Sequence, residues 1–218
     1  MGLNALLDKM LVGRNERKTT KVASFCDVNI LVENGLTVLD LGCGNGLFCD
    51  AISKFSSVSR AVGADVVDYR KKPIDFQLFR EGERIPFDDK SFDYTFIMEV
   101  LHHSDDPERL LKEAVRVTRG SLVIFEDVVT SRSRLLFMYG LDILMNIRHG
   151  VNLPLNFRSE NEWIQIFEQM NLLIRNTYDY SFYPPQRSRV FVLDVNDVCL
   201  SKDRVVPDTE IAEQDLQS

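Results

Sequence analysis

Cysteine is scarce in this sequence of 218 residues, and its few copies show no regular spacing. They are Cys26, Cys43, Cys49 and Cys199, and no C-x-x-C pair is among them. Zinc sites and the disulfide frameworks of small secreted domains both depend on characteristic cysteine spacings. We therefore predict no metal site, and free thiols in a reducing compartment, as is typical of a cytoplasmic protein.

A positive net charge and long apolar runs are also lacking. The formal net charge is −7, whereas a protein that binds a nucleic-acid backbone usually carries a basic excess or stripe, so a nucleic-acid partner is disfavoured. No run reaches the ~18 uncharged apolar residues of a membrane span. Asp8 and Lys9 interrupt the early apolar residues, which argues against a signal peptide. The basic stretch 14–21 fits a solvated helix face or a peripheral membrane or substrate-mouth patch, and these interpretations stay open.

What the sequence does contain is an alternation of strand-like apolar segments with helical patterns. Strands are predicted at residues 37–41, 61–65, 74–79, 94–98 and 121–125, with two more β-rich runs at 172–178 and 189–195. Asp106-Pro107 and Ser159-x-x-Glu162 are typical N-terminal signals and predict where two helices begin. Strands that alternate with helices in this way favour βαβ units and a parallel sheet.

The composition, with 44% hydrophobic and 27% charged residues, indicates one main domain. We predict this domain at residues 35–200. An N-terminal helical cap is predicted at residues 1–34, as two helical patterns with the basic stretch between them. Residues 201–218 are polar and acidic, so we predict a flexible tail there.

One segment inside the main domain has an unusual pattern. Residues 135–147 are apolar nearly all round, although Asp142 interrupts them. Such a segment is too short to span a bilayer and too apolar for an exposed helix. The surrounding residues 131–158 are therefore predicted to be a helical insertion, which is either core or a lid over an apolar pocket.

The most informative stretch is the end of the first predicted strand. Glycines follow that strand at every second position, as Gly42, Gly44 and Gly46. Glycine lets the backbone turn sharply and approach a ligand closely, so a strand, a glycine turn and a helix predict a nucleotide-type pocket. The spacing departs from the dinucleotide fingerprint, because Leu47 stands where the third small residue belongs. Asp65, at the end of the second strand, can accept hydrogen bonds from both ribose hydroxyls or be a solvated loop acid.

Three segments together resemble a known family, the class I S-adenosylmethionine-dependent methyltransferases, and in particular the small-molecule branch that includes quinone-biosynthesis enzymes. The segments are Leu39-Asp40-Leu41-Gly42-Cys43-Gly44-Asn45-Gly46, Arg80 to Phe87, and Val100-Leu101-His102-His103 followed by Asp106-Pro107-Glu108. The resemblance spans about residues 36–127 and, more loosely, 155–195. Two departures are Arg80, where the family has glycine, and Thr118-Arg119-Gly120, where it has Pro-Gly-Gly.

The resemblance implies a Rossmann-like α/β fold. Its doubly wound sheet would have seven strands, mostly parallel with an antiparallel final strand, and helices on both faces. It also implies S-adenosylmethionine as the methyl donor, S-adenosylhomocysteine as the product, a small-molecule acceptor, and a monomer or dimer. The implied cofactor-binding residues are Asp40, Gly42, Cys43, Gly44, Asn45, Gly46, Asp65, Val66, Glu81, Gly82 and Glu99.

Two of these residues have specific expected roles. Asp40 would place negative charge near the cationic, amino-acid end of the cofactor, while the amides of the glycine turn contact the ligand; the alternative is a structural hydrogen bond to its own turn. Glu81 would face the adenine amino group, and its alternative is a surface charge. The residues themselves leave both alternatives open.

Methyl transfer by in-line attack needs proximity and alignment, and a general base helps when the acceptor must lose a proton. His102, His103 and Glu99 follow the fourth strand and are the candidate bases. Alternatively, one histidine caps the next helix and the other is solvated. Candidate wall residues for an apolar or aromatic acceptor are Phe137, Met138, Tyr139, Tyr183 and Arg187. A protein of this fold that has lost catalysis and acts as a binding or assembly partner is the competing hypothesis.

Overall fold

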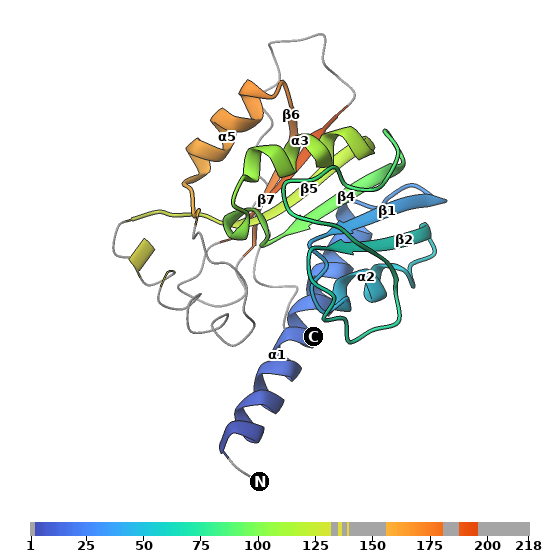
Figure 1. The fold of residues 1–218 in the computed structure, drawn as a ribbon, viewed down its shortest axis with the longest axis vertical. Helices are drawn as coiled ribbons and strands as arrows, with labels where there is room; N and C mark the ends of the chain where they lie inside the picture. Colours follow the sequence, from blue (N-terminus) through green and yellow to red (C-terminus); the bar gives the residue numbers. More distant parts are fainter. Residues whose placement is uncertain (1–2, 132–134, 137–138, 140–155, 181–187, 196–218) are drawn as a thin grey trace. The chain divides into compact units, whose positions relative to one another are not determined.

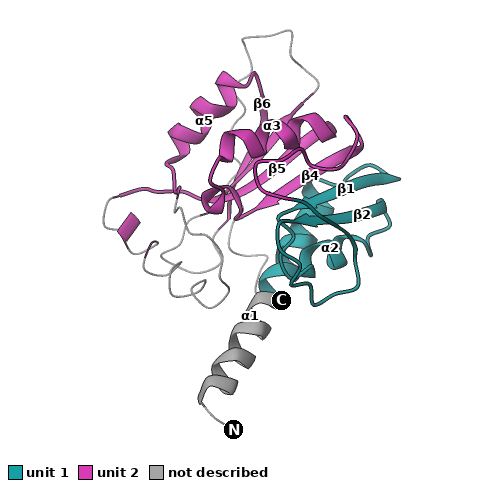
Figure 2. Ribbon diagram, in the orientation of Figure 1, with its two compact units in different colours: residues 1–79 teal, residues 80–218 magenta. Residues whose placement is uncertain are grey.

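The computed structural model describes residues 3–131, 135–136, 139, 156–180 and 188–195, with side chains from residue 16 onward. The chain forms two compact units, Met1–Phe79 and Arg80–Ser218, which Figure 2 shows in two colours. No helix in the described ranges is both long enough and apolar enough to cross a membrane. The predicted tail and most of the predicted insertion at 131–158 lie outside the described residues, and so does Cys199.

The first unit consists of two helices and three parallel strands (Figure 1). In chain order they are α1 (Leu3–Asn29), β1 (Leu36–Leu41), α2 (Leu47–Ile52), β2 (Val58–Asp65) and β3 (Asp75–Leu78). β2 pairs with β1 on one side and with β3 on the other. The side chains of β1 are nearly all buried, as expected for a central strand of a parallel sheet.

The N-terminal helix differs from the prediction. We expected two helical patterns separated by a basic stretch, but α1 is one continuous helix of 27 residues. Lysine and arginine are good helix formers, so the basic stretch extends the helix rather than interrupting it. Val22, Ala23 and Cys26 form a buried face near its C-terminal end, and Ile30, directly after the helix, is also buried.

The second unit contains four strands and the helices that connect them (Figure 1). They are β4 (Phe92–Met98), the short 3-10 helix η1 (Leu101–His103), α3 (Pro107–Val117), β5 (Thr118–Asp127), α5 (Glu160–Gln169), β6 (Leu173–Tyr180) and β7 (Ser188–Asp194). β4 and β5 are parallel, while β7 is antiparallel to both β5 and β6. β7 is thus the antiparallel final strand that the resemblance implied.

Both predicted helix starts are confirmed. Asp106 precedes Pro107, and its Oδ1 accepts a hydrogen bond from the N–H of Arg109 at 3.0 Å. The capping box at the start of α5 is also present, because Ser159 Oγ accepts from Glu162 N and Glu162 Oε2 accepts from Ser159 N. These signals are local in sequence, so the sequence alone was sufficient to predict them.

The seven strands have the order β3-β2-β1-β4-β5-β7-β6 in one mixed sheet. This order, with β7 as the antiparallel strand, confirms the predicted Rossmann-like class. The carboxyl end of β1 leads into the glycine turn, and the carboxyl end of β4 leads into η1. Ligands of open α/β sheets bind outside such strand ends.

Candidate functional site

The glycine turn has the conformation that its sequence predicts. Gly42, Gly44 and Gly46 have φ angles of 76°, 53° and 75°, in the left-handed region where a residue with a side chain is strained. Gly46 is the N-cap of α2, so the turn leads directly into that helix. The backbone therefore reverses within five residues at the end of a buried strand.

The amides of this turn are already engaged by the protein. The N–H groups of Gly42 and Cys43 both donate to Ala64 O, at 2.7 and 3.2 Å. Gly46 N donates to Cys43 O at 2.9 Å, and Leu47 N donates to the Asn45 side chain at 3.0 Å. A loop that binds phosphate presents such N–H groups to the anion instead. The turn therefore differs from an anion cradle, and the expected contact of its amides with a ligand stays a prediction.

Asp65 connects the glycine turn to the chain that follows β2. Its Oδ2 accepts from Gly44 N at 2.8 Å, while its Oδ1 accepts from Val66 N at 2.7 Å and Val67 N at 3.2 Å. Burial raises the pKa of this carboxyl, and the three N–H donors oppose the rise. Asp65 is thus a structural residue of the turn. Its predicted ribose contact stays a prediction, for which Oδ2 has one further lone pair, whereas Oδ1 already accepts two N–H groups.

Asp40 is the most unusual group of the site. Its side chain is 2% exposed, and Oδ2 is buried without a hydrogen-bond partner in the described part of the chain. Burial, reinforced by the charge of Asp65, raises the pKa of Asp40 to about 7, although a backbone hydrogen bond from Cys49 acts in the opposite direction. A buried, under-satisfied carboxylate is costly by itself and is stabilised by a cation or a donor.

The other predicted cofactor residues of the first unit lie around these two acids. Cys43 is 7% exposed and packs closely on β2, because a Cβ on Gly63 would lie 2.8 Å from its Sγ. Val66 is 42% exposed directly after Asp65. The backbone oxygen of Asn45 accepts from Lys71 N at 2.9 Å. The structure thus brings the glycine turn, Asp40 and Asp65 together within one compact unit.

Glu81 and Gly82 lie in the second unit, in the exposed turn before β4. Glu81 Oε1 accepts from Ser104 Oγ at 2.9 Å and from Asp105 N at 2.8 Å, so this carboxylate connects its turn to the residues after η1. Gly82 has a φ of 74°. The adenine contact predicted for Glu81 is untested, and the observed role of the side chain is to fix the turn.

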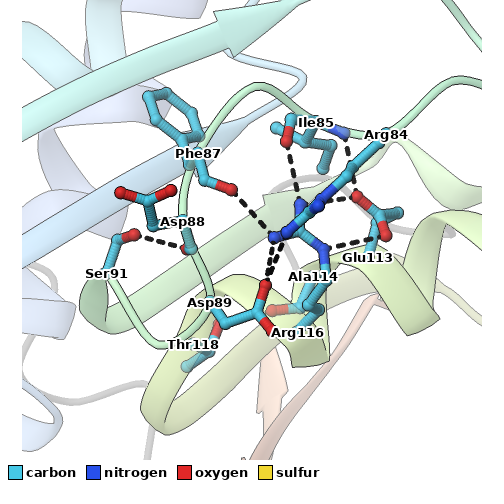
Figure 3. A network of polar contacts seen from close by, with 10 residues as sticks. All are labelled: Arg84, Ile85, Phe87, Asp88, Asp89, Ser91, Glu113, Ala114, Arg116 and Thr118. Atoms are coloured by element: carbon cyan, nitrogen blue, oxygen red, sulfur yellow. Dashed lines mark hydrogen bonds and ion pairs between the residues drawn. The ribbon is translucent and has the colours of Figure 1, made fainter.

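An arginine on α3 anchors the chain between this turn and β4. As Figure 3 shows, the guanidinium of Arg116 donates to Glu113, to Asp89 and to the backbone oxygens of Ile85 and Phe87. Glu113 in turn accepts from Ile85 N at 2.8 Å. All five N–H groups of the guanidinium are used, which is the full donor capacity of an arginine side chain.

His102 forms a buried pair with Glu126, an acid at the end of β5 that the prediction did not include. His102 Nδ1 lies 2.6 Å from Glu126 Oε2, and the two residues are 4% and 1% exposed. Glu126 Oε1 accepts from the N–H groups of Val100 and Leu101, at 3.1 and 2.8 Å. The imidazole stacks on Phe157 with ring centroids 4.6 Å apart. Because a carboxylate only accepts hydrogen bonds, the Nδ1–H of His102 is the donor in this pair.

The remaining candidates have different positions. Glu99 has a φ of 57°, a left-handed conformation that is rare for a residue with a side chain and common near functional sites. His103 lies beside His102, with ring centroids 4.1 Å apart. Tyr139 lies 5.7 Å from Phe157 between ring centroids. The other predicted acceptor residues, Phe137, Met138, Tyr183 and Arg187, are outside the described residues.

Residues 39–124 match the methyltransferase domain as a protein family. This stretch, about two fifths of the chain, is therefore a methyltransferase domain of that family. The fold of the chain is similar to that of the YcgJ protein from Bacillus subtilis, with a TM-score of 0.61 over 79% of this chain and 96% of that one, at 14% identity. A methyltransferase domain of this kind implies S-adenosylmethionine as the cofactor.

Two curated proteins show more specific similarity over part of the methyltransferase chain. The mitochondrial ubiquinone biosynthesis O-methyltransferase of Candida albicans is 36% identical over 40% of this chain and 30% of its own length. The demethylmenaquinone methyltransferase of Paenarthrobacter aurescens is 32% identical over 55% of this chain and 48% of its own length. The matches thus cover less than half the length of either relative.

Proposed function

We propose that this methyltransferase-family protein binds S-adenosylmethionine at the glycine turn and transfers its methyl group to a small apolar or aromatic acceptor. One observation supports the proposal most strongly. Two buried carboxylates, Asp40 and Asp65, lie at a glycine turn whose amides are already engaged. The charge of one raises the pKa of the other, so the pair favours a positively charged ligand.

The charges of the two carboxylates distinguish between two classes of cofactor. A nicotinamide dinucleotide would bring two phosphate charges to a site with two carboxylates and few available amides, which is repulsive at low effective dielectric. S-adenosylmethionine instead has a sulfonium and an α-ammonium group. Asp40, with its under-satisfied Oδ2, is the residue that would bind the cationic amino-acid end.

The chemistry that the cofactor supplies is an activated methyl carbon, so the protein must mainly align the acceptor and accept its proton. For this second task we propose His102 as the general base, with the acceptor proton received at Nε2. Glu126 is then the positioning residue, because it fixes the Nδ1–H tautomer and the orientation of the ring. In the transfer the carbon–sulfur bond breaks, its electron pair stays on sulfur, and a bond forms between the acceptor and the methyl carbon.

The acceptor class is inferred from chemistry and from the relatives. Phe157 stacks on the imidazole of His102, and Tyr139 in turn lies beside Phe157, so two aromatic side chains extend from the proposed base. The two curated relatives are named for ubiquinone biosynthesis and for demethylmenaquinone. Both facts support a phenolic or quinol-like acceptor, which loses a proton when its oxygen or ring carbon is methylated.

A turnover assay against phenols, quinols, lipids and amines tests the proposed reaction. We expect S-adenosylhomocysteine to form with at least one phenol or quinol. With that acceptor, His102→Gln should lower kcat by roughly 100-fold or more while the affinity for S-adenosylhomocysteine stays unchanged. Tight cofactor binding with no transfer to any acceptor would contradict catalysis and favour a binding or assembly role. An unchanged kcat in His102→Gln would remove His102 as the base.

A further inference from the structure

Apart from its two end residues, Val66 and Ile74, the connection between β2 and β3, residues 66–74, has no role in the predictions from sequence. It joins two parallel strands in nine residues that form bends and coil without a helix. Parallel neighbours usually need a crossover of a dozen or more residues, most often with a helix. The connection leaves the carboxyl end of β2, beside the glycine turn, and returns to the start of β3, where Asp75 pairs with Val62.

Several contacts show that the β2–β3 connection packs directly on the glycine turn. Lys71 N donates to Asn45 O at 2.9 Å. A Cβ on Gly46 would lie 3.1 Å from Ile74 Cδ1, and a Cβ on Gly63 would lie 2.6 Å from the same atom. These glycines are therefore required for the close approach of the connection as well as for the turn itself.

Tyr69 is the polar aromatic residue of this connection and lies next to Asp65. Its hydroxyl oxygen would be 3.3 Å from a Cβ on Gly44, the residue whose N–H donates to Asp65 Oδ2. Burial, with smaller contributions from Asp65 and Cys43, raises the pKa of Tyr69 to about 12, so the hydroxyl stays protonated. The side chain is 44% exposed, beside the exposed Val66 and Val67. A hydroxyl donor and a carboxylate acceptor thus flank the same glycine.

We propose that Tyr69 is a further ligand-binding residue of this site, whose hydroxyl donates a hydrogen bond to a ribose hydroxyl of the bound nucleoside. The inference rests on the proposed cofactor function. A ribose hydroxyl both donates and accepts: its proton suits the remaining lone pair on Asp65 Oδ2, and its oxygen suits a donor. Asp65 already accepts three N–H groups, and as a carboxylate it can only accept from a ribose hydroxyl. A neighbouring hydroxyl donor would supply the hydrogen bond that the ribose oxygen can accept.

Calorimetric titration of Tyr69→Phe with S-adenosylhomocysteine tests this role. We expect the affinity to fall about three- to tenfold, the range for loss of one hydrogen bond. The 2′-deoxy and 3′-deoxy analogues of S-adenosylhomocysteine identify the contact, because the analogue that lacks the contacted hydroxyl should bind wild type and Tyr69→Phe equally well. Tyr178→Phe, which removes a hydroxyl in β6, is the matched control and should leave every affinity unchanged.

Each outcome has a defined meaning, provided that circular dichroism shows both variants folded as wild type. If wild type does not bind S-adenosylhomocysteine, the proposed function and this inference both fail. If wild type binds it but Tyr69→Phe binds it equally well, only the inference about Tyr69 fails. An equal loss of affinity for S-adenosylhomocysteine and both deoxy analogues would also overturn the ribose contact.

Discussion

At the residue scale, the central group is Asp40. Its carboxyl has a raised pKa in the folded protein, so the folded state holds a proton that the unfolded state releases at lower pH. The stability of the ligand-free protein should therefore fall as pH rises between about 4 and about 7, and level off above that. A cationic ligand would remove this cost by stabilising the ionised carboxylate.

The substitution Asp40→Asn tests this predicted fall of stability with rising pH. We expect the variant to gain stability relative to wild type as pH rises from 5 to 8, by roughly 2–3 kcal/mol, since one pKa unit corresponds to about 1.4 kcal/mol. Urea unfolding of both proteins at the two pH values measures the difference. The exposed Asp88→Asn is the control, with a difference near zero at both pH values. A stability difference for Asp40→Asn that does not change with pH would contradict the account.

Other residues of the site could be predicted only in part. The three glycines and Asp65 stand in a local pattern, so their position at the strand ends followed from the sequence. The engagement of Asp65 by three N–H groups depends on the folded turn, and the pairing of His102 with Glu126 joins residues 24 positions apart. Glu126 belonged to an acidic pair at the end of a predicted strand, which is a weak signal for a partner of histidine.

At the scale of elements, α3 and the chain before β4 depend on Arg116. Its guanidinium is 17% exposed and connects Glu113 and Asp89 to two backbone oxygens of that chain (Figure 3). Arg116→Ala would leave Glu113 without its cation and two carbonyls without their donor. We expect a loss of about 2–4 kcal/mol in unfolding free energy, measured by chemical denaturation.

A matched control lies on the same helix. Lys112→Ala removes an exposed cation from α3, so its effect on stability should stay within about 0.5 kcal/mol. If Arg116→Ala were no more destabilising than Lys112→Ala, the network would be a surface arrangement without a structural role.

The elements also show where local signals were sufficient. Asp106-Pro107 and the Ser159–Glu162 capping box predicted the starts of α3 and α5, since capping depends on residues within one helical turn. The N-terminal segment was predicted as two helical patterns with a basic stretch between them, and the structure joins them in the single helix α1. The β2–β3 connection had no signal for its packing on Gly44, Gly46 and Gly63, which is a tertiary contact.

At the scale of the whole molecule, the strand order and the antiparallel β7 agree with the class inferred from the first motif. The number of strands and the antiparallel final strand followed only from the resemblance, and the order was not predicted, because periodicity indicates strands without ordering them. The preference for a cationic cofactor is different in kind. It depends on the burial of Asp40, the charge of Asp65 and the engaged amides, which together exist only in the folded chain.

Calorimetric titration of the wild-type protein with S-adenosylmethionine and with NAD tests this central claim most directly. The account predicts saturable binding of S-adenosylmethionine at a single site, and no saturable binding of NAD, because the buried carboxylates repel its phosphates. Saturable binding of NAD together with no binding of S-adenosylmethionine would contradict the account.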